Sequence, residues 1–205
     1  MKTILFFLTI FSLSSCANNI YFSEDAYELS EQHQTFAIIP PKVAITPGKN
    51  IDSSTISTQQ KTESLNFQKE MFSWFLKRKT QGKFAPELQD VETTNALLAK
   101  AGYPDTPMTS AELCEVLHVD GYIISNFQLS KPVSENTAIA LALIAGVSAS
   151  TNQVSVNLSI NDCSRTKMIW NTSFIHQGGI GSSPAILVND IMRYCSKKMP
   201  YADQK

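Results

Sequence analysis

The stretch that decides the fold is "NQVSVNLSINDCSRTKMIWNTSFIHQ", residues 152–177. Apolar and polar residues alternate in its first half, which is typical of a strand with one buried face. The apolar members of this alternation are Val154, Val156, Leu158 and Ile160. Residues 167–177 are also rich in β-branched and aromatic residues, although they alternate less regularly. With only "CSRT" (163–166) between the halves, the stretch predicts a β-hairpin.

Upstream of the hairpin, the sequence predicts further strands and helices. Residues 35–45 form a strand that Pro40 and Pro41 interrupt or hold at a sheet edge, because proline donates no ladder hydrogen bond. Residues 46–60 are rich in Gly, Pro and Ser and predict a loop. Two more strands are expected at 88–94 and 120–132.

Four segments predict helices. The first, 63–81, has a broad apolar face and ends at Gly82, and the second, 94–101, ends at Gly102. A third begins after Thr109 or Ser110, either of which can cap it, and contains Leu113, Val116 and Leu117. The last, 184–199, has a moderately apolar face, formed by Ile186, Leu187, Asp190, Ile191, Tyr194 and Cys195.

Together these elements predict an α+β fold: a mixed sheet of about four or five strands with three or four helices packed on it. We expect one domain over residues 35–205, interrupted by an apolar insertion at 133–153. We interpret residues 16–34, which are polar and without sustained periodicity, as a tether.

The first 16 residues, "MKTILFFLTIFSLSSC", have the layout of a secretory signal peptide. Lys2 is followed by an apolar block of about ten residues, too short for the roughly 20 that span a bilayer. The tetrad Leu13-Ser14-Ser15-Cys16 resembles the lipobox of bacterial lipoproteins. That resemblance implies cleavage of residues 1–15 and lipidation of Cys16, which anchors the chain to a membrane because several acyl chains bind durably.

The mature chain carries a formal charge of −2, from 16 basic and 18 acidic residues once Lys2 is removed. Such a near-neutral chain without a basic stripe is not expected to bind nucleic acid. The densest basic run is Lys77-Arg78-Lys79, at the end of a predicted helix. It is interpreted first as a solvated helix end that suits the helix dipole, and alternatively as a contact with a membrane or an anionic polymer.

The sequence contains no recognisable catalytic or metal-binding motif. Besides Cys16, the cysteines are Cys114, Cys163 and Cys195. This odd number leaves at least one thiol unpaired. The histidines are equally scattered, at His33, His118 and His176, without zinc spacing or an HExxH helix. A serine elbow, GxSxG, is absent as well. We therefore expect no enzyme activity, no metal and no cofactor.

Three segments carry a family resemblance: "ELCEVLHVDGYIISNFQ" (112–128), "VSVNLSINDCSRTKMIWNTSF" (154–174) and the closing "KKMP" (197–200). They resemble the domain shared by the N-terminal part of TolB, the penicillin-binding-protein activator lipoproteins and the curli-secretion lipoprotein. In that pattern a helix precedes a strand opened by Asp120-Gly121, and a hairpin with Asp162 and Trp170 follows. This chain departs from it at 165–167, where a turn glycine is usual. Members of the family activate synthases, scaffold complexes or form pores, so the shared fold does not determine which function this chain has.

The apolar insertion "VSENTAIALALIAGVSASTNQ" (133–153) has three interpretations. It packs on its own domain, it forms an interaction or oligomer surface, or it enters a membrane. As a helix it would be about 21 Å long, short of a bilayer core of about 30 Å, whereas as a strand it alternates in the manner of a membrane hairpin. The candidate interaction residues are Ile139, Leu141, Leu143, Ile144 and Val147.

From the sequence we expect a non-catalytic envelope lipoprotein that acts as a binding, scaffold or assembly module. The alternative is a subunit of an oligomeric outer-membrane secretion pore built around the insertion. The chain lacks an Asp after Cys16, where one would resemble an inner-membrane retention signal. We therefore expect attachment to the periplasmic face of the outer membrane, with a protein partner in the envelope.

Overall fold

The hairpin is the centre of the sheet. The computed structural model describes residues 20–46, 53–130, 152–178 and 184–201. Strands β6 (Asn152–Asp162) and β7 (Lys167–Gly178) pair antiparallel, with one register shift at Ile160/Asn161. The turn between them places Thr166 at a φ of 51°, in the left-handed region that glycine adopts without strain. The predicted hairpin is confirmed, and the missing turn glycine is replaced by a strained threonine.

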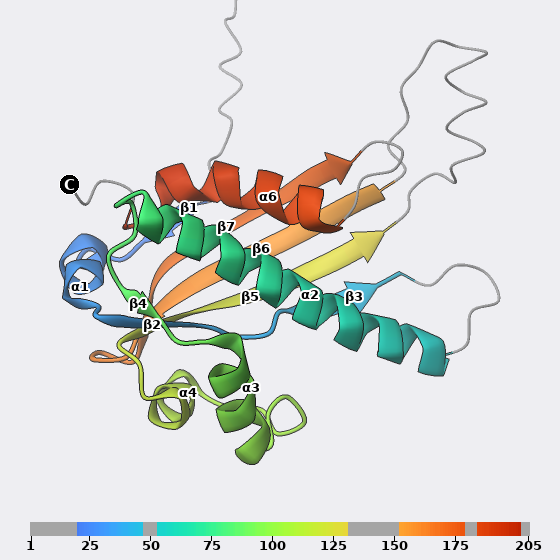
Figure 1. Ribbon diagram of the computed structural model, residues 1–205, viewed down its shortest axis with the longest axis horizontal. Coiled ribbons are helices and arrows are strands. Elements are labelled where there is room, and N and C mark those ends of the chain that lie inside the picture. Colours follow the sequence, from blue (N-terminus) through green and yellow to red (C-terminus); the bar gives the residue numbers. More distant parts are fainter. Residues whose placement is uncertain (1–19, 47–52, 131–151, 179–183, 202–205) are drawn as a thin grey trace, which may run out of the picture.

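A mixed seven-stranded sheet extends from this hairpin in the order β1-β7-β6-β5-β2-β4, and β3 also pairs with β5 (Figure 1). The pairs on the β7 side of β5 are antiparallel, and those of β5 with β2 and β3 are parallel. The remaining strands are β1 (Ile20–Phe22), β2 (Thr35–Ile38), β3 (Lys42–Ile45), β4 (Glu87–Leu88) and β5 (Gly121–Ser130). The α+β class is correct, but the strand number exceeds the expected four or five. Strands of two or three residues are too short to show an alternation.

Pro40 and Pro41 break one strand into β2 and β3, which both pair with β5. Between Ile38 and Lys42 the chain advances four residues, while their partners on β5, Ile123 and Asn126, are three apart. One extra residue therefore reverses the facing of β3, so that Val43 packs against the same core as Phe36 and Ile38.

Helices cover both faces of the sheet. On one face lie α2 (Ser53–Thr80) and α6 (Pro184–Cys195), which is followed by the 3₁₀ turn η1 (Ser196–Lys198) (Figure 1). They enclose a core that includes Phe67, Met71, Phe75, Phe127, Leu158, Trp170 and Ile191. On the other face, α3 (Val91–Lys100) and α4 (Ser110–Leu117) cover a smaller core around Tyr122, Leu98, Leu113 and Leu117. No described helix is long and apolar enough to cross a membrane.

The predicted helix boundaries are confirmed where capping signals are strong. Thr109 is the N-cap of α4 and forms a capping box with Glu112. Gly82 and Gly102 follow α2 and α3 with φ values of 66° and 86°. The helix α3 begins at Val91, three residues before the predicted start, because the Asp90 side chain caps it by accepting from the backbone of Thr93. The strand predicted at 88–94 is therefore wrong beyond Leu88, where β4 ends.

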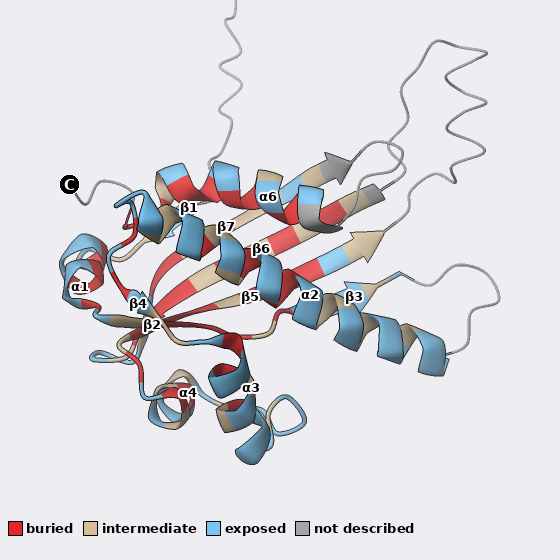
Figure 2. Cartoon of the chain, in the orientation of Figure 1, coloured by how far each residue is buried: buried red, intermediate tan, exposed pale blue. Residues whose placement is uncertain are grey.

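Two further boundary predictions are wrong. Residues 20–34, assigned to a tether over 16–34, instead contain β1 and α1 (Ala26–Gln32), and Ala26 and Leu29 are buried. Short elements held by tertiary contacts leave no periodicity in the sequence. The loop predicted at 46–60 is wrong from Ser53 onward, where α2 begins. Figure 2 shows that these first turns of α2 are largely exposed, so they carry no apolar stripe that could signal a helix.

The face of the last helix is also different from the prediction. Leu187, Val188, Ile191, Met192 and Cys195 are buried, whereas Ile186 and Tyr194 are 52% and 45% exposed. Compared with the predicted face, the buried face of α6 is rotated by about one residue, so that it includes Val188 and Met192.

Candidate binding groove

A groove opens between the N-terminal half of α2, strand β3 and the turn that follows α3. Its volume is about 470 Å³, within the range of about 300–1,000 Å³ that is usual for ligand sites. The walls are mainly apolar: Pro40, Pro41, Val43, Leu65, Leu98, Tyr103 and Pro104. The rest of the lining is polar. It consists of two cations, Lys42 and Lys61, and of uncharged side chains: Ser57, Gln60, Ser64 and Asn95.

The strand break shapes one wall of this groove. Because Pro40 and Pro41 interrupt the ladder, the carbonyls of Ile38 and Pro41 are free to bond to α2. The buried Gln68 donates to the first at 2.7 Å, and Ser64 donates to the second at 2.6 Å. These bonds hold α2 against the double proline and so fix the position of this wall of the groove.

The lining of the groove offers apolar contacts and a few hydrogen-bonding groups to a ligand. None of its lining residues is a carboxylate, a histidine or a cysteine. Its one titratable wall residue besides the two lysines is Tyr103, and burial raises the pKa of that phenol. Leu65, 44% exposed, gives an apolar contact at the α2 rim.

The other grouping of titratable side chains is buried and structural. The His33 ring lies 2.6 Å from the hydroxyl of Tyr201 through Nδ1 and 2.9 Å from Asp162 through Nε2. All three side chains are almost fully buried. Burial, with the carboxylates of Asp162 and Asp120, raises the pKa of Tyr201 well above its usual value, so the phenol keeps its proton.

The residues of the family pattern support this same end of the fold. Asp162 also accepts from the backbone N–H of Arg165 at 2.7 Å and thereby fixes the hairpin turn. Asp120 accepts from the Thr35 hydroxyl and backbone, each at 2.8 Å. A side chain at Gly121 would meet the His33 ring at 2.5 Å. Their positions are therefore explained by folding and require no catalytic role.

Cys114 and Cys163 form a disulfide, which ties α4 to the β6–β7 turn. Cys195 is a buried free thiol, and burial raises its pKa to about 12. The odd count had required an unpaired cysteine without telling which one. Distance in sequence gave no signal for the pairing, because the two partners are brought together only by the tertiary fold.

The predicted site residues lie outside the described residues. These are Leu13, Ser14, Ser15 and Cys16 of the lipobox, and Ile139, Leu141, Leu143, Ile144 and Val147 of the insertion. Within the described ranges no group of His, Cys, Asp or Glu side chains could hold a metal ion. The groove was missed from the sequence, because its walls come from segments that are distant along the chain.

No protein-family model matches the sequence. No curated protein matches it either. Solved structures with a similar arrangement include lipoprotein GNA1162 from Neisseria meningitidis, which is 10% identical. It has a TM-score of 0.48, and the match covers 80% of this chain and 96% of that one.

Two further structures are similar to this chain at lower scores. The LpoB C-terminal domain from Salmonella enterica is 7% identical, with a TM-score of 0.35 and coverage of 71% and 83%. The PelC dodecamer from Paraburkholderia phytofirmans is 10% identical, with a TM-score of 0.38 and coverage of 80% and 86%. All three scores are below 0.5, so the functional proposal rests on the residues of this chain.

Proposed function

We propose that this chain is a lipid-anchored envelope protein that binds a partner in the groove and catalyses no reaction. The observation that carries the proposal is the groove itself: about 470 Å³, apolar walls and no carboxylate, imidazole or thiol in its lining. An extended segment of a partner protein suits such a surface, since three prolines and three aliphatic side chains offer flat apolar contacts.

The lipobox and the disulfide support an envelope location. Leu13-Ser14-Ser15-Cys16 directs lipidation of Cys16, and the lipid attaches the chain to the periplasmic face of the outer membrane. Cys114–Cys163 forms readily in an oxidising compartment and is rare in the cytosol.

Site-specific crosslinking in intact envelopes tests the groove. A photoreactive residue replaces Leu65, which lies in the groove, or Leu76 as the control. The two leucines are 44% and 45% exposed and lie about three turns apart on nearly the same face of α2. A discrete crosslinked protein at 65, absent at 76 and lost on adding Ser57→Glu at an exposed position of the groove lining, supports the proposal. The same products at both positions, or none at 65, contradict it.

A secretion-pore subunit is the second candidate, and one observation favours it. Ser130 pairs with Gln153, so the chain that leaves β5 returns at the neighbouring position of the antiparallel strand β6. The last two residues of the predicted insertion, Asn152 and Gln153, thus belong to β6. The test is the particle mass of the lipidated protein in mild detergent, beside a variant without Val133–Gln153. A large ring that collapses in the variant supports a pore, whereas an unchanged monomer or dimer eliminates it.

A further inference from the structure

Positive charge is concentrated where α2 and α6 end. Seven of the 17 basic residues lie in these helix ends and the segments just after them: Lys77, Arg78, Lys79, Lys83, Arg193, Lys197 and Lys198. Of this set only Lys79 forms an ion pair within the described residues, with Glu87 at 2.8 Å. The two helix C-termini supply a negative partial charge of roughly one unit in total. A local excess of roughly five positive charges therefore remains, on a chain whose overall formal charge is −1.

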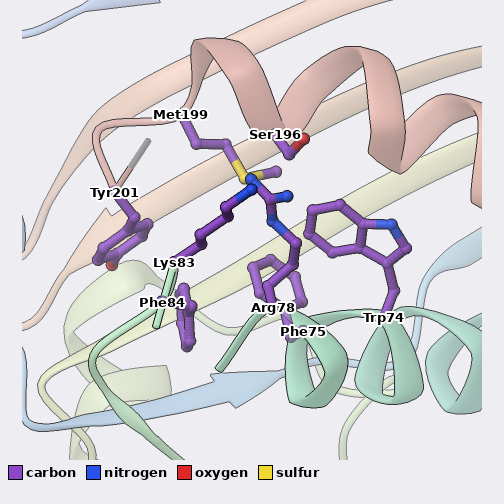
Figure 3. A pocket seen from close by; sticks show the side chains of 8 residues that line it. All are labelled: Trp74, Phe75, Arg78, Lys83, Phe84, Ser196, Met199 and Tyr201. Atoms are coloured by element: carbon purple, nitrogen blue, oxygen red, sulfur yellow. The ribbon is translucent and has the colours of Figure 1, made fainter. Parts of the chain in front are cut away.

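The two helix ends adjoin and share a small hollow of about 10 Å³. Figure 3 shows the side chains of Arg78 and Lys83 converging in this hollow beside Met199, with Trp74 next to them. The guanidinium of Arg78 lies 5.3 Å from the centre of the Trp74 ring. Two neighbouring cations without a described carboxylate between them attract an anion.

This basic surface lies next to the place where the chain enters the fold. Ile20 pairs with Thr172 on β7. The neighbours of Thr172 on the same face of β7, Trp170 and Phe174, contact the end of α6. The Trp170 indole donates to the carbonyl of Lys198 at 2.6 Å, and the Phe174 ring lies 5.2 Å from that of Tyr194.

The lipidated residue cannot be far from this surface. Four residue steps separate Cys16 from Ile20, and an extended chain of that length spans about 14 Å at most. The anchor thus holds the domain close to the headgroups, where each lysine or arginine near an anionic surface contributes to binding within a Debye length of about 8 Å. Tyr194, 45% exposed and bonded to the Lys198 ammonium at 2.8 Å, adds an amphipathic side chain at the same corner.

We propose that the ends of α2 and α6, with Arg78 and Lys83 at the centre, dock the domain onto the anionic phosphate headgroups of the anchoring membrane. The proposal relies on the proposed lipid anchor for the closeness of the surface to the bilayer. The docked domain has a fixed orientation, with a second contact beside the lipid.

Vesicle binding tests the docking without the anchor. A chain starting at Ala17 lacks Cys16 but keeps every described element, since the first begins at Ile20. Its co-sedimentation is measured with vesicles of phosphatidylethanolamine and phosphatidylglycerol, and with phosphatidylcholine alone. The test variant combines Arg78→Glu, Lys83→Glu and Lys197→Glu. The control combines Lys69→Glu, Lys100→Glu and Arg165→Glu, which reverse the same number and kinds of charges at exposed positions elsewhere.

The expected result is binding to the anionic vesicles only, weakened at least about tenfold in the test variant and much less in the control. No binding by the unaltered chain, or equal loss in both variants, overturns the proposal. Displacement by inorganic phosphate, where chloride of equal ionic strength has no effect, shows a site for free phosphate and overturns it as well. Leu65→Glu should leave vesicle binding unchanged, so a failure of the groove hypothesis is distinguishable from a failure of docking. Mass measurement of the N-terminal peptide tests lipidation separately.

Discussion

The indole of Trp170 donates a hydrogen bond of 2.6 Å to the backbone carbonyl of Lys198. This bond joins the middle of the hairpin to the end of the last helical segment, across 28 residues of sequence. Trp170 is fully buried, so the bond forms in a region of low dielectric constant where an unpaired carbonyl is costly.

Trp170→Phe should lower the free energy of unfolding by about 1–3 kcal/mol, because it removes the donor and leaves the Lys198 carbonyl unpaired. Urea unfolding measures the change. Trp74→Phe is the matched control: Trp74 is only partly buried and has no described hydrogen bond, so its loss should be much smaller. Equal losses would show that aromatic volume, and not the bond, matters at Trp170.

Replacing both Cys114 and Cys163 by alanine should destabilise the domain. Their separation of 49 residues corresponds to about 4 kcal/mol in the loop-entropy treatment. Unfolding in urea with and without a reductant checks this, and the reductant should affect only the unaltered protein.

In the native protein without urea, Cys195 should resist alkylation, because it is buried and its pKa is about 12. Rapid modification of Cys195 would contradict the packing of α6.

Thr166→Gly should stabilise the protein by about 1 kcal/mol, since a threonine at a φ of 51° carries strain that glycine does not. Thermal unfolding should show a higher midpoint. Ser164→Gly, in the same turn but without a positive φ, is the control and should not stabilise. A lower midpoint for Thr166→Gly would mean that chain entropy outweighs the relief of strain.

Acid should weaken the contact between Asp120 and the start of β2. Burial raises the pKa of Asp120, but hydrogen bonds from Thr35 and Gln34 outweigh it, so the net pKa is lowered. A lowered pKa in the folded state stabilises the fold above the unfolded value of about 4, and this stabilisation is lost as the pH falls through the folded pKa. Asp120→Asn should therefore be less stable at pH 7 and show a shallower acid decline. Parallel pH profiles for both proteins would contradict this assignment.

Elements whose signals are local were predictable from the sequence. The alternation of Val154 to Ile160, the capping residue Thr109 and the terminators Gly82 and Gly102 depend on neighbours along the chain, and each is confirmed. The short strands β1 and β4 depend on long-range pairing, which no local pattern records.

The groove and the basic surface were beyond sequence reasoning for the same reason. Lys77-Arg78-Lys79 was visible as a run of charge, but the end of α6 beside it was not. Likewise, Leu65 and Pro104 are remote in sequence and meet only because α2 lies over the double proline.

The number of residues at the break around Pro40–Pro41 determines which face of the sheet each side chain of β3 occupies. Because the side chains of a strand alternate, removing one residue there would turn Val43 away from the core and direct Lys42 and Ala44 toward it. The segment should therefore tolerate changes of residue type far better than a change of length. Related chains should vary freely in which residues occupy the break while keeping their number constant.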